Sequence, residues 1–429
     1  MRRPVWALHV LVVGLALHNF AMAELWDAGV RGFWLDVVSA WKEAVLLVAL
    51  VLVVRARRGI PFKATGADWL AFAFAALVLL YAVIPQDWLG GGATPKGVLY
   101  GVRHDLLPVA AYFLGRGLDL TRDDVRRLAF TILATACAVA AFGLVDVYAI
   151  PLQWWRESGA PGWFKEQLGL RYKGLSGLPE NFVYNTGNER PLRRLVSTFL
   201  SPLASSYLFV VALLLLWTWR RLTVWWIGAA ALVSAGLLWT HSRSSYLALA
   251  VGLVAIGLSR RGSLAVAAAV AVVGAGALFV RVYPSLAPET RFTPRELKVQ
   301  RAGGVQGPAA SGVSDASTES HWRNLRDGTE TVARHPWGYG VGNAGVTAFR
   351  THVELKAGES TYTELGVETG LLGALAFIAW SVALVRRVLP RSAWVGASLV
   401  AVLALALQTD VIGVPWLAIV LWALAGDQS

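Results

Sequence analysis

The chain has 429 residues, of which 56% are hydrophobic and 15% are charged, and its formal net charge is +12. A soluble domain needs more polar surface than this composition supplies. Apolar runs long enough to cross a bilayer recur along the whole chain, which predicts a polytopic helical membrane protein and not a β-barrel. The basic residues gather in short turns between these runs. That is a topology signal and argues against nucleic acid as a partner.

Twelve candidate membrane spans follow one another in a single transmembrane domain, residues 1–429. The fourth span is weak because Arg103, His104 and Asp105 interrupt it. The last two spans are short and share a polar turn at residues 408–410. The predicted spans cover residues 5–24, 33–54, 67–84, 98–115, 125–148, 197–219, 222–240, 244–259, 263–281, 361–385, 393–409 and 411–425.

The basic residues at the N-terminus and in every second turn fall on one side of these spans, which must then be cytoplasmic. Both termini are therefore predicted inside. The opposite side receives two long segments, 149–196 and 282–360, and we expect the working surface there. The basic residues that set this orientation are Arg2, Arg3, Arg55, Arg57, Arg58, Lys63, Arg122, Arg126, Arg127, Arg220, Arg221, Arg260, Arg261, Arg386, Arg387 and Arg391.

The two outward segments differ in composition. The first, 149–196, has four aromatic residues between Trp154 and Phe164 next to Lys165 and Arg171. This pattern predicts either an amphipathic helix at the level of the lipid headgroups or an ordinary aromatic belt. Within the larger outward segment, residues 303–318 are rich in Gly, Ala and Ser, and we expect them to form a mobile cover.

Three of the arginines on the predicted outer side stand out, because the positive-inside rule does not explain them. Arg194 precedes a span, Arg243 lies in a turn between two spans, and Arg323 lies in the large outward segment. Charges near hydrocarbon are costly and often functional, and arginine binds phosphate in a planar, bidentate way. The three therefore indicate an anionic ligand, such as a diphosphate. Snorkelling to headgroups or pairing with a carboxylate is the alternative for each.

Glu359 ends the large outward segment directly before a span. A carboxylate at a membrane boundary can act as a general base, because its surroundings shift its pKa. It can equally be an acid that the helix dipole stabilises at a helix N-terminus. Glu364 and Glu368 follow on the next helical turns, and we expect them to pair inside the bundle.

Together these segments resemble the O-antigen ligase and O-antigen polymerase superfamily. The resemblance covers residues 190–380 in motif and the remainder in topology. The motifs are an Arg-containing start of a middle span, a Ser-Arg turn, an Arg followed by a His-Pro turn rich in Gly, and a polar pair opening a span that continues Glu-x-Gly-Leu-x-Gly. They stand at Arg194–Pro202 with Ala204–Tyr207, at Thr240–Ser244, at Arg323 with His335–Asn343, and at Glu359–Tyr362 with Glu368–Gly373.

The resemblance implies a GT-C-like enzyme in the bacterial cytoplasmic membrane, with its active site facing the periplasm or exterior. Members of the family transfer a glycan from undecaprenyl diphosphate to a hydroxyl of a lipid, glycan or protein acceptor, with inversion and without a metal or other cofactor. This chain has one cysteine, Cys137, and no Cys/His spacing typical of a metal site. A chain-length regulator is a further possible partner.

We therefore assign Arg194 and Arg243 to the diphosphate, Arg323 to the sugar or the phosphate, and Glu359 to the acceptor hydroxyl. Ligases resembling this chain carry His-Asn where it has Glu359 and Ser360, so the polymerase assignment is preferred over the ligase. Protein O-glycosylation comes third. A transporter or flippase of lipid-linked glycans is the alternative of another class, and a membrane scaffold leaves the outward arginines unexplained. Further candidates for the site are Arg103, His241, His335, His352 and Tyr362.

Overall fold

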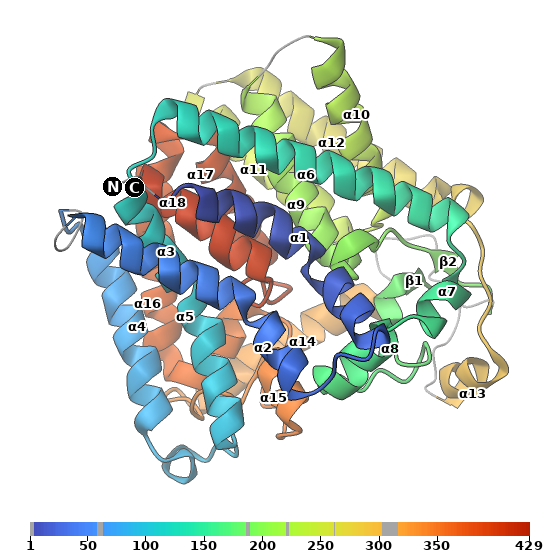
Figure 1. Cartoon of the computed structure of the whole chain (residues 1–429), viewed down its shortest axis with the longest axis horizontal. Helices are drawn as coiled ribbons and strands as arrows, with labels where there is room; N and C mark the ends of the chain where they lie inside the picture. The colour runs from blue at the N-terminus through green and yellow to red at the C-terminus, as the bar shows by residue number, and fades with distance from the viewer. Residues whose placement is uncertain (1–3, 58–62, 186–188, 220–222, 261, 303–315) are drawn as a thin grey trace.

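The computed structural model describes residues 4–57, 63–185, 189–219, 223–260, 262–302 and 316–429. Helices dominate these residues, and the two strands are short, which confirms the all-α fold class (Figure 1). The α-helices are α1 (Trp6–Asp27), α2 (Phe33–Ser39), α3 (Trp41–Arg57), α4 (Gly66–Val83), α5 (Pro95–Leu118), α6 (Arg122–Ala149), α7 (Leu152–Glu157), α8 (Ala160–Gly162), α9 (Pro202–Thr218), α10 (Val224–Trp239), α11 (Arg243–Arg260), α12 (Ser263–Leu286), α13 (Pro294–Ala302), α14 (Ala316–Arg334), α15 (Gly345–Thr351), α16 (Thr361–Arg391), α17 (Ala393–Leu405) and α18 (Trp422–Gln428). The 3₁₀-helices are η1 (Gln86–Leu89), η3 (Glu180–Phe182) and η4 (Ser197–Phe199), and the π-helical segments are η2 (Trp163–Gln167) and η5 (Leu417–Leu421). The antiparallel strands are β1 (Val183–Tyr184) and β2 (Leu192–Arg193).

Each predicted span coincides with helical structure, but the helices differ in their capacity to cross a bilayer. By length and composition, α1, α4, α6, α12 and α16 can cross it, and α2 with α3 forms a sixth candidate bent by 43°. The helices α9, α10 and α17 and the C-terminal stretch from η5 through α18 are apolar but shorter. An integral membrane protein is thus supported, whereas the number of twelve spans and their sidedness stay predictions.

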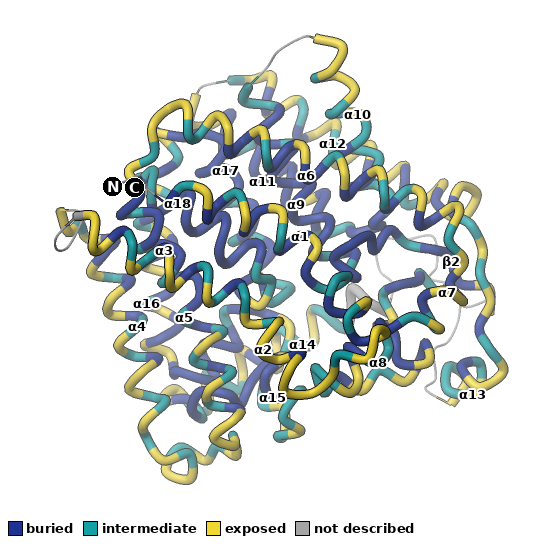
Figure 2. Tube along the Cα trace, in the orientation of Figure 1, coloured by how far each residue is buried: buried dark blue, intermediate teal, exposed yellow. Residues whose placement is uncertain are grey.

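Large apolar side chains are exposed on the outer faces of many helices (Figure 2). A soluble monomer rarely exposes large contiguous apolar areas, because water disfavours them. Lipid tails would cover these side chains at no such cost, which fits the predicted membrane location. Among the most exposed are Val83, Leu99, Trp225, Leu258, Val270 and Leu372.

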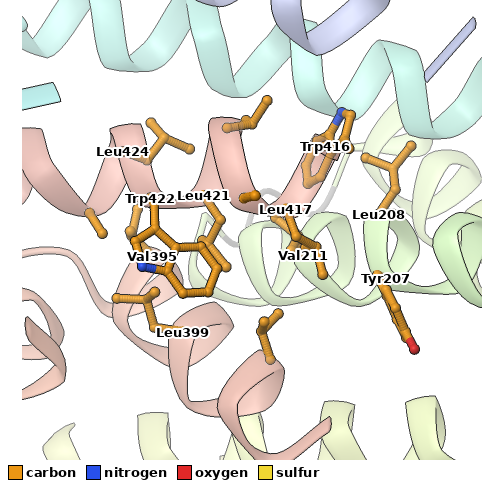
Figure 3. Close-up of a cluster of buried hydrophobic side chains, with 14 of the residues drawn as sticks. Tyr207, Leu208, Val211, Val395, Leu399, Trp416, Leu417, Leu421, Trp422 and Leu424 are labelled. Carbon is orange, nitrogen blue, oxygen red and sulfur yellow. The ribbon is translucent and has the colours of Figure 1, made fainter. Parts of the chain in front are cut away.

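The last predicted span, 411–425, lies inside the bundle rather than on its surface. Trp416 and Trp422 are almost fully buried and pack among side chains of α9 and α17 (Figure 3). A helix that is apolar on all sides is stable only when other helices surround it. Replacing either tryptophan with alanine would cost about 3–5 kcal/mol of stability, the usual loss for a large buried aromatic.

The first outward segment packs against α1. Trp155, Trp163 and Phe164 are buried in one cluster with Trp26 of that helix. Trp154 is 39% exposed, so it is the aromatic residue of this group that can reach a headgroup layer. The aromatic residues thus serve mainly to fix the segment to the helical bundle, and the segment then leads through β1 and β2 toward Arg194.

The larger outward segment contributes α13, α14 and α15. Helix α14 packs along α16, and this packing brings His321 of α14 next to Glu359. Most of residues 303–318, predicted to be a mobile cover, lie outside the described residues.

Candidate functional site

Arg194 and Arg243 come together although 48 residues separate them in sequence. The Arg194 Nε donates a hydrogen bond of 2.9 Å to the carbonyl oxygen of Thr240, in the turn between α10 and α11. Burial lowers the pKa of the Arg194 guanidinium, and the nearby positive charge of Arg243 lowers it further. Two cations within electrostatic range of each other, both near the start of α11, form a place where an anion is stabilised.

The arginine neighbours differ in their partners. Arg193 is buried and pairs with Asp146 of α6, with 2.8 Å between Nη2 and Oδ1. Within the described part of the chain, Arg194 instead donates only to backbone carbonyls, those of Thr240 and His241. A carbonyl oxygen carries no net charge, so the positive charge of Arg194 remains available to a ligand.

Aromatic rings fix the turn that holds this pair. His241 has a left-handed backbone conformation, with φ of 50°, and is buried. Its ring stacks on Tyr283 with 4.2 Å between centroids, and Tyr184 lies 4.4 Å away on another side. His241, a candidate base from the sequence, is therefore part of the wall of the arginine site.

Glu359 pairs with a histidine that sequence reasoning did not place in the site. The His321 Nδ1 on α14 lies 2.7 Å from Oε2 of Glu359. The hydrogen bond from His321 holds the pKa of Glu359 below its ordinary value, and Asn324 adds a second hydrogen bond, although partial burial opposes the shift. Arg323 lies between these two residues on the same helix and is exposed. The first and last residues of the His-Trp-Arg-Asn motif thus bond the carboxylate from one helix.

A strained backbone sets the position of Glu359. Its φ is +78°, which is unusual for a residue with a side chain. Its N–H donates to the carboxylate of Glu364, one turn into α16. The next residue, Ser360, donates from its hydroxyl to the carbonyl of Ala406 at 3.1 Å. These bonds lock the entry of α16 and aim the Glu359 side chain at α14.

Near Glu359 lies a buried polar network that joins α5, α16 and the turn after α17. The imidazole of His104 on α5 bridges two carboxylates, with 2.8 Å from Nδ1 to Asp105 and 2.9 Å from Nε2 to Asp410. Glu364 and Glu368 of α16 face the same group. Both glutamates are buried inside the bundle, as expected, and Glu368 shares a hydrogen bond with Asp105, whereas the pairing of Glu364 stays a prediction. The sequence did not predict this network, because His104 and Asp410 are 306 residues apart in the chain.

The network has the donor atoms of a metal site but an arrangement that favours hydrogen bonding. Donor atoms of His104, Glu364 and Asp410 lie within 4.8 Å of one another. An ionised carboxylate only accepts hydrogen bonds, so His104 must donate from both ring nitrogens to Asp105 and Asp410. It then keeps no lone pair for a metal. The group consequently fits a protonated imidazole between carboxylates better than a metal ion.

The His-Pro turn fills a break in α16. The helix leaves helical geometry at Gly370, with φ of 69° and ψ of 179°. The carbonyl of Val367 next to the break accepts from Tyr339 at 2.6 Å, and Leu371 donates back to Pro336 at 2.7 Å. Two of the sequence motifs are therefore halves of one structure, because the turn satisfies backbone groups that the break sets free.

Glycines in this turn permit close contact with α5. A Cβ on Gly342 would lie 2.7 Å from the backbone of Gly97, and its φ is +93°. The N–H of Gly342 also donates to Glu368 at 2.9 Å. Within the same turn, His335 stacks on Tyr339 with 4.0 Å between centroids and bonds the carbonyl of Leu89 at 2.9 Å. His335 thus shapes the turn.

Serines connect the arginine site with the region of Glu359. Ser245, near the start of α11, contacts the hydroxyl of Ser206 on α9 at 2.7 Å and that of Ser242 at 2.8 Å. The next residue on α9, Tyr207, lies beside Thr409. The carbonyl of Thr409 accepts from Thr361 at the start of α16, at 3.1 Å. The two candidate groups therefore share one polar framework, although distant parts of the chain supply them.

The remaining candidates from the sequence have other partners. Arg103 pairs with Glu43 of α3, with 2.7 Å between Nε and Oε1. Tyr362 donates to the carbonyl of Leu403 at 2.8 Å and so anchors α16 on α17. His352 ends α15 and lines a cavity between α5 and the first outward segment. In the described part of the chain, none of these three residues is observed in contact with Arg194 or Glu359.

Comparison with known families gives one match. The family model described as O-antigen ligase matches residues 228–378. This match supports the resemblance of the chain to the O-antigen ligase and O-antigen polymerase superfamily. The match contains Arg243, Arg323 and Glu359, whereas Arg194 precedes it. No curated protein matches the chain.

The match supports a glycosyltransferase-like enzyme acting on lipid-linked glycan. The matched stretch runs from α10 into α16, so it includes the Ser-Arg turn, α14 with His321, and the broken helix with its His-Pro turn. These elements build most of the candidate site.

Proposed function

We propose that the protein is an inverting, metal-independent glycosyltransferase at the outer face of the bacterial cytoplasmic membrane. It transfers a glycan from undecaprenyl diphosphate to an acceptor hydroxyl, and its favoured role is the polymerisation of O-antigen or a related surface polysaccharide. The observation that carries this proposal is the environment of Arg194. This partly buried guanidinium lies beside Arg243 and donates to backbone carbonyls instead of a carboxylate.

The proposed reaction is a single displacement at the anomeric carbon. The acceptor oxygen forms a bond to C1 of the donor sugar while the C1–O bond to the diphosphate breaks, and the configuration at C1 inverts. The acceptor proton moves to Glu359, and the lipid diphosphate leaves with the bonding electrons. Negative charge grows on the leaving group, so preorganised cations at Arg194 and Arg243 stabilise the transition state more than the ground state.

Glu359 is suited to the acceptor end of this reaction. Its lowered pKa keeps it ionised at neutral pH, when it accepts a hydrogen bond or a proton. Its partner His321 can share the proton that Glu359 takes from the acceptor, because an imidazole accepts and donates protons near neutral pH. We assign Arg323, which is exposed on the same helix, to the sugar or a phosphate oxygen of the donor.

The polymerase is preferred over the ligase on the residues at the start of α16. Ligases resembling this chain carry His-Asn at Glu359 and Ser360. In this chain the imidazole beside Glu359 is that of His321, which comes from α14 and not from the start of α16. The ligase remains the second candidate because the matching family model is described by that activity.

The experiment supplies purified protein with undecaprenyl-diphosphate glycan alone. A ladder of longer lipid-linked products indicates a polymerase. Transfer that begins only after lipid A core or a serine peptide is added indicates a ligase or a protein-glycosylating enzyme. Glu359→Ala should abolish the products, whereas Glu354→Ala should not. Glu354 lies in the same segment, is highly exposed and pairs with Lys356, so its substitution is a matched control.

One structural feature keeps a transporter as the alternative of another class. Transporters often use broken helices with buried charges, and α16 has a break at Gly370 close to buried carboxylates. The enzymatic proposal fails if no acceptor yields transfer and Glu359→Ala behaves like the wild type in cells. Movement of labelled lipid-linked glycan across proteoliposomes by that same protein would then establish transport.

A further inference from the structure

A cavity of about 310 Å³ lies where three segments that are distant in sequence meet. The first turns of α5 contribute Lys96 and Tyr100, the end of η2 contributes Gln167, and the end of α15 contributes Arg350. These segments are all on the predicted outer side, and α15 packs against α5 (Figure 1). None of the residues assigned to glycosyl transfer lines this cavity.

Arg350 is held in place without a compensating negative charge. Its Nε donates to the carbonyl of Leu168 at 2.8 Å, and its guanidinium lies 4.7 Å from the centre of the Tyr100 ring. Among the described residues no carboxylate lies within ion-pair distance of it. Burial lowers the pKa of Arg350, and the positive charge of Arg103 contributes in the same direction. A partly desolvated cation in this position gains free energy when an anion binds.

The nearby acidic groups form no ion pair with this cation within the described residues. Glu43 is engaged with Arg103 at 2.7 Å, and Asp36, which attracts Arg350 only at longer range, accepts from the amide of Gln167 at 2.7 Å. Glu166 is the acidic residue among those lining the cavity, together with the two cations Lys96 and Arg350. The lining therefore keeps a net positive charge.

The start of α5 adds a second favourable element for an anion. Thr94 caps this helix, its hydroxyl accepting from the N–H of Gly97 at 3.1 Å, and Thr94 also lines the cavity. The positive end of a 24-residue helix dipole thus points to the same space as Lys96 and Arg350. Threonine hydroxyls that line the cavity can bond sugar hydroxyls.

We propose that this cavity binds an acidic sugar of the glycan, through a carboxylate or phosphate group held by Arg350 and Lys96. Its volume is at the small end of ligand sites and suits one monosaccharide. The inference deepens the proposed function, on which it rests, because it makes the enzyme selective for glycans that carry negative charge.

The test measures binding without the donor, so it does not depend on transfer. Purified full-length protein in nanodiscs of neutral phosphatidylcholine is titrated with glucuronic acid, with glucose 6-phosphate and with glucose. The acidic sugars should bind saturably and more tightly than glucose. Arg350→Gln should weaken their binding about tenfold or more, as expected for lost hydrogen bonds to a charged group. Arg171→Gln, at an exposed arginine of the first outward segment, should leave it unchanged.

Two further variants keep the proposal testable if Arg350→Gln fails to fold. Lys96→Gln should weaken binding of the acidic sugars several-fold, and Glu166→Gln should strengthen it, since each changes one charge at the cavity. Equal binding of glucose and glucuronic acid, or no response to these three substitutions, would overturn the proposal. The proposal would also be overturned if Arg350→Gln weakened binding of phosphatidylglycerol in the nanodisc but changed the binding of neither acidic sugar. The bound anion would then be a lipid headgroup. A product ladder in the donor assay with no acidic-sugar binding here would reject this inference alone.

Discussion

Arg193 and Arg194 are neighbours in sequence, yet they serve two different regions of the molecule. The Arg193 guanidinium points into the bundle and pairs with Asp146, which also accepts from Trp155 at 2.6 Å. The Arg194 guanidinium points to the turn before α11 and meets backbone carbonyls and another arginine. The difference teaches that a charge paired inside the protein serves the fold, whereas a cation without a carboxylate partner is poised for a ligand.

The largest expected effect is on stability. Arg193→Ala leaves the carboxylate of Asp146 buried without its cation and should cost about 3–5 kcal/mol of unfolding free energy. Thermal or denaturant unfolding of the detergent-solubilised protein measures it. The double variant Arg193→Met with Asp146→Asn should recover most of the loss, because it removes both charges together. Equal destabilisation by the single and double variants would show that the pair is not the cause.

The matching change at the next residue should affect catalysis instead. Arg194→Ala should lower turnover about 10²- to 10³-fold, the usual effect of removing one preorganised donor to a developing negative charge. Membrane insertion and the unfolding midpoint should stay close to the wild type. Arg194→Lys should recover only part of the activity, since lysine keeps the charge but loses the planar pair of donors. Normal turnover of Arg194→Ala and Arg243→Ala would refute the diphosphate assignment.

The pair of Glu359 and His321 offers a pH-dependent version of the same comparison. The hydrogen bond from His321 lowers the pKa of Glu359, so His321→Ala should raise that pKa toward the ordinary value of 4.5. The acidic limb of the pH–rate profile should therefore move to higher pH. Because the folded-state pKa is lowered, the pair stabilises the fold above the ordinary glutamate pKa, and this contribution disappears as the pH falls through the folded-state value.

Asn324→Ala is the control for the acidic limb. It removes the weaker hydrogen bond and should shift the limb in the same direction by a smaller amount. An acidic limb that is unchanged in both variants would mean that ionisation of Glu359 does not limit the reaction, and that another group accepts the proton.

Helices were largely predictable from the sequence because long apolar runs are a local signal. Every predicted span corresponds to helical structure, including the fourth, whose charges made it weak. The break of α16 at Gly370 was not predicted, since glycine is common in membrane helices and its φ depends on the His-Pro turn that packs there. That turn is about 30 residues earlier in the chain.

The sequence nominates residues for the candidate site but does not indicate their partners. Arg194, Arg243 and Arg323 are nominated by positive charge on the predicted outer side, and Glu359 by its place directly before a span. His321 could have been found from its place two residues before Arg323, but its bond to Glu359 spans 38 residues. Neither local pattern nor charge distinguishes Arg193 from Arg194. Their difference depends on Asp146, which lies 47 residues earlier and is brought close only by the folded chain.

The smallest expected effect is at His335, which the sequence left between a catalytic and a shaping role. Its ring stacks on Tyr339 and bonds the carbonyl of Leu89, both within the framework that holds the break of α16. His335→Ala should therefore cost about 0.5–1.5 kcal/mol, one hydrogen bond's worth of stability. Unfolding midpoints measure this loss, while kcat at saturating donor should change less than with Arg194→Ala. His335→Asn keeps a donor near Leu89 and should recover part of the stability. A loss of turnover as large as that of Arg194→Ala, at unchanged stability, would show that His335 acts on the substrate and does not mainly stabilise the fold.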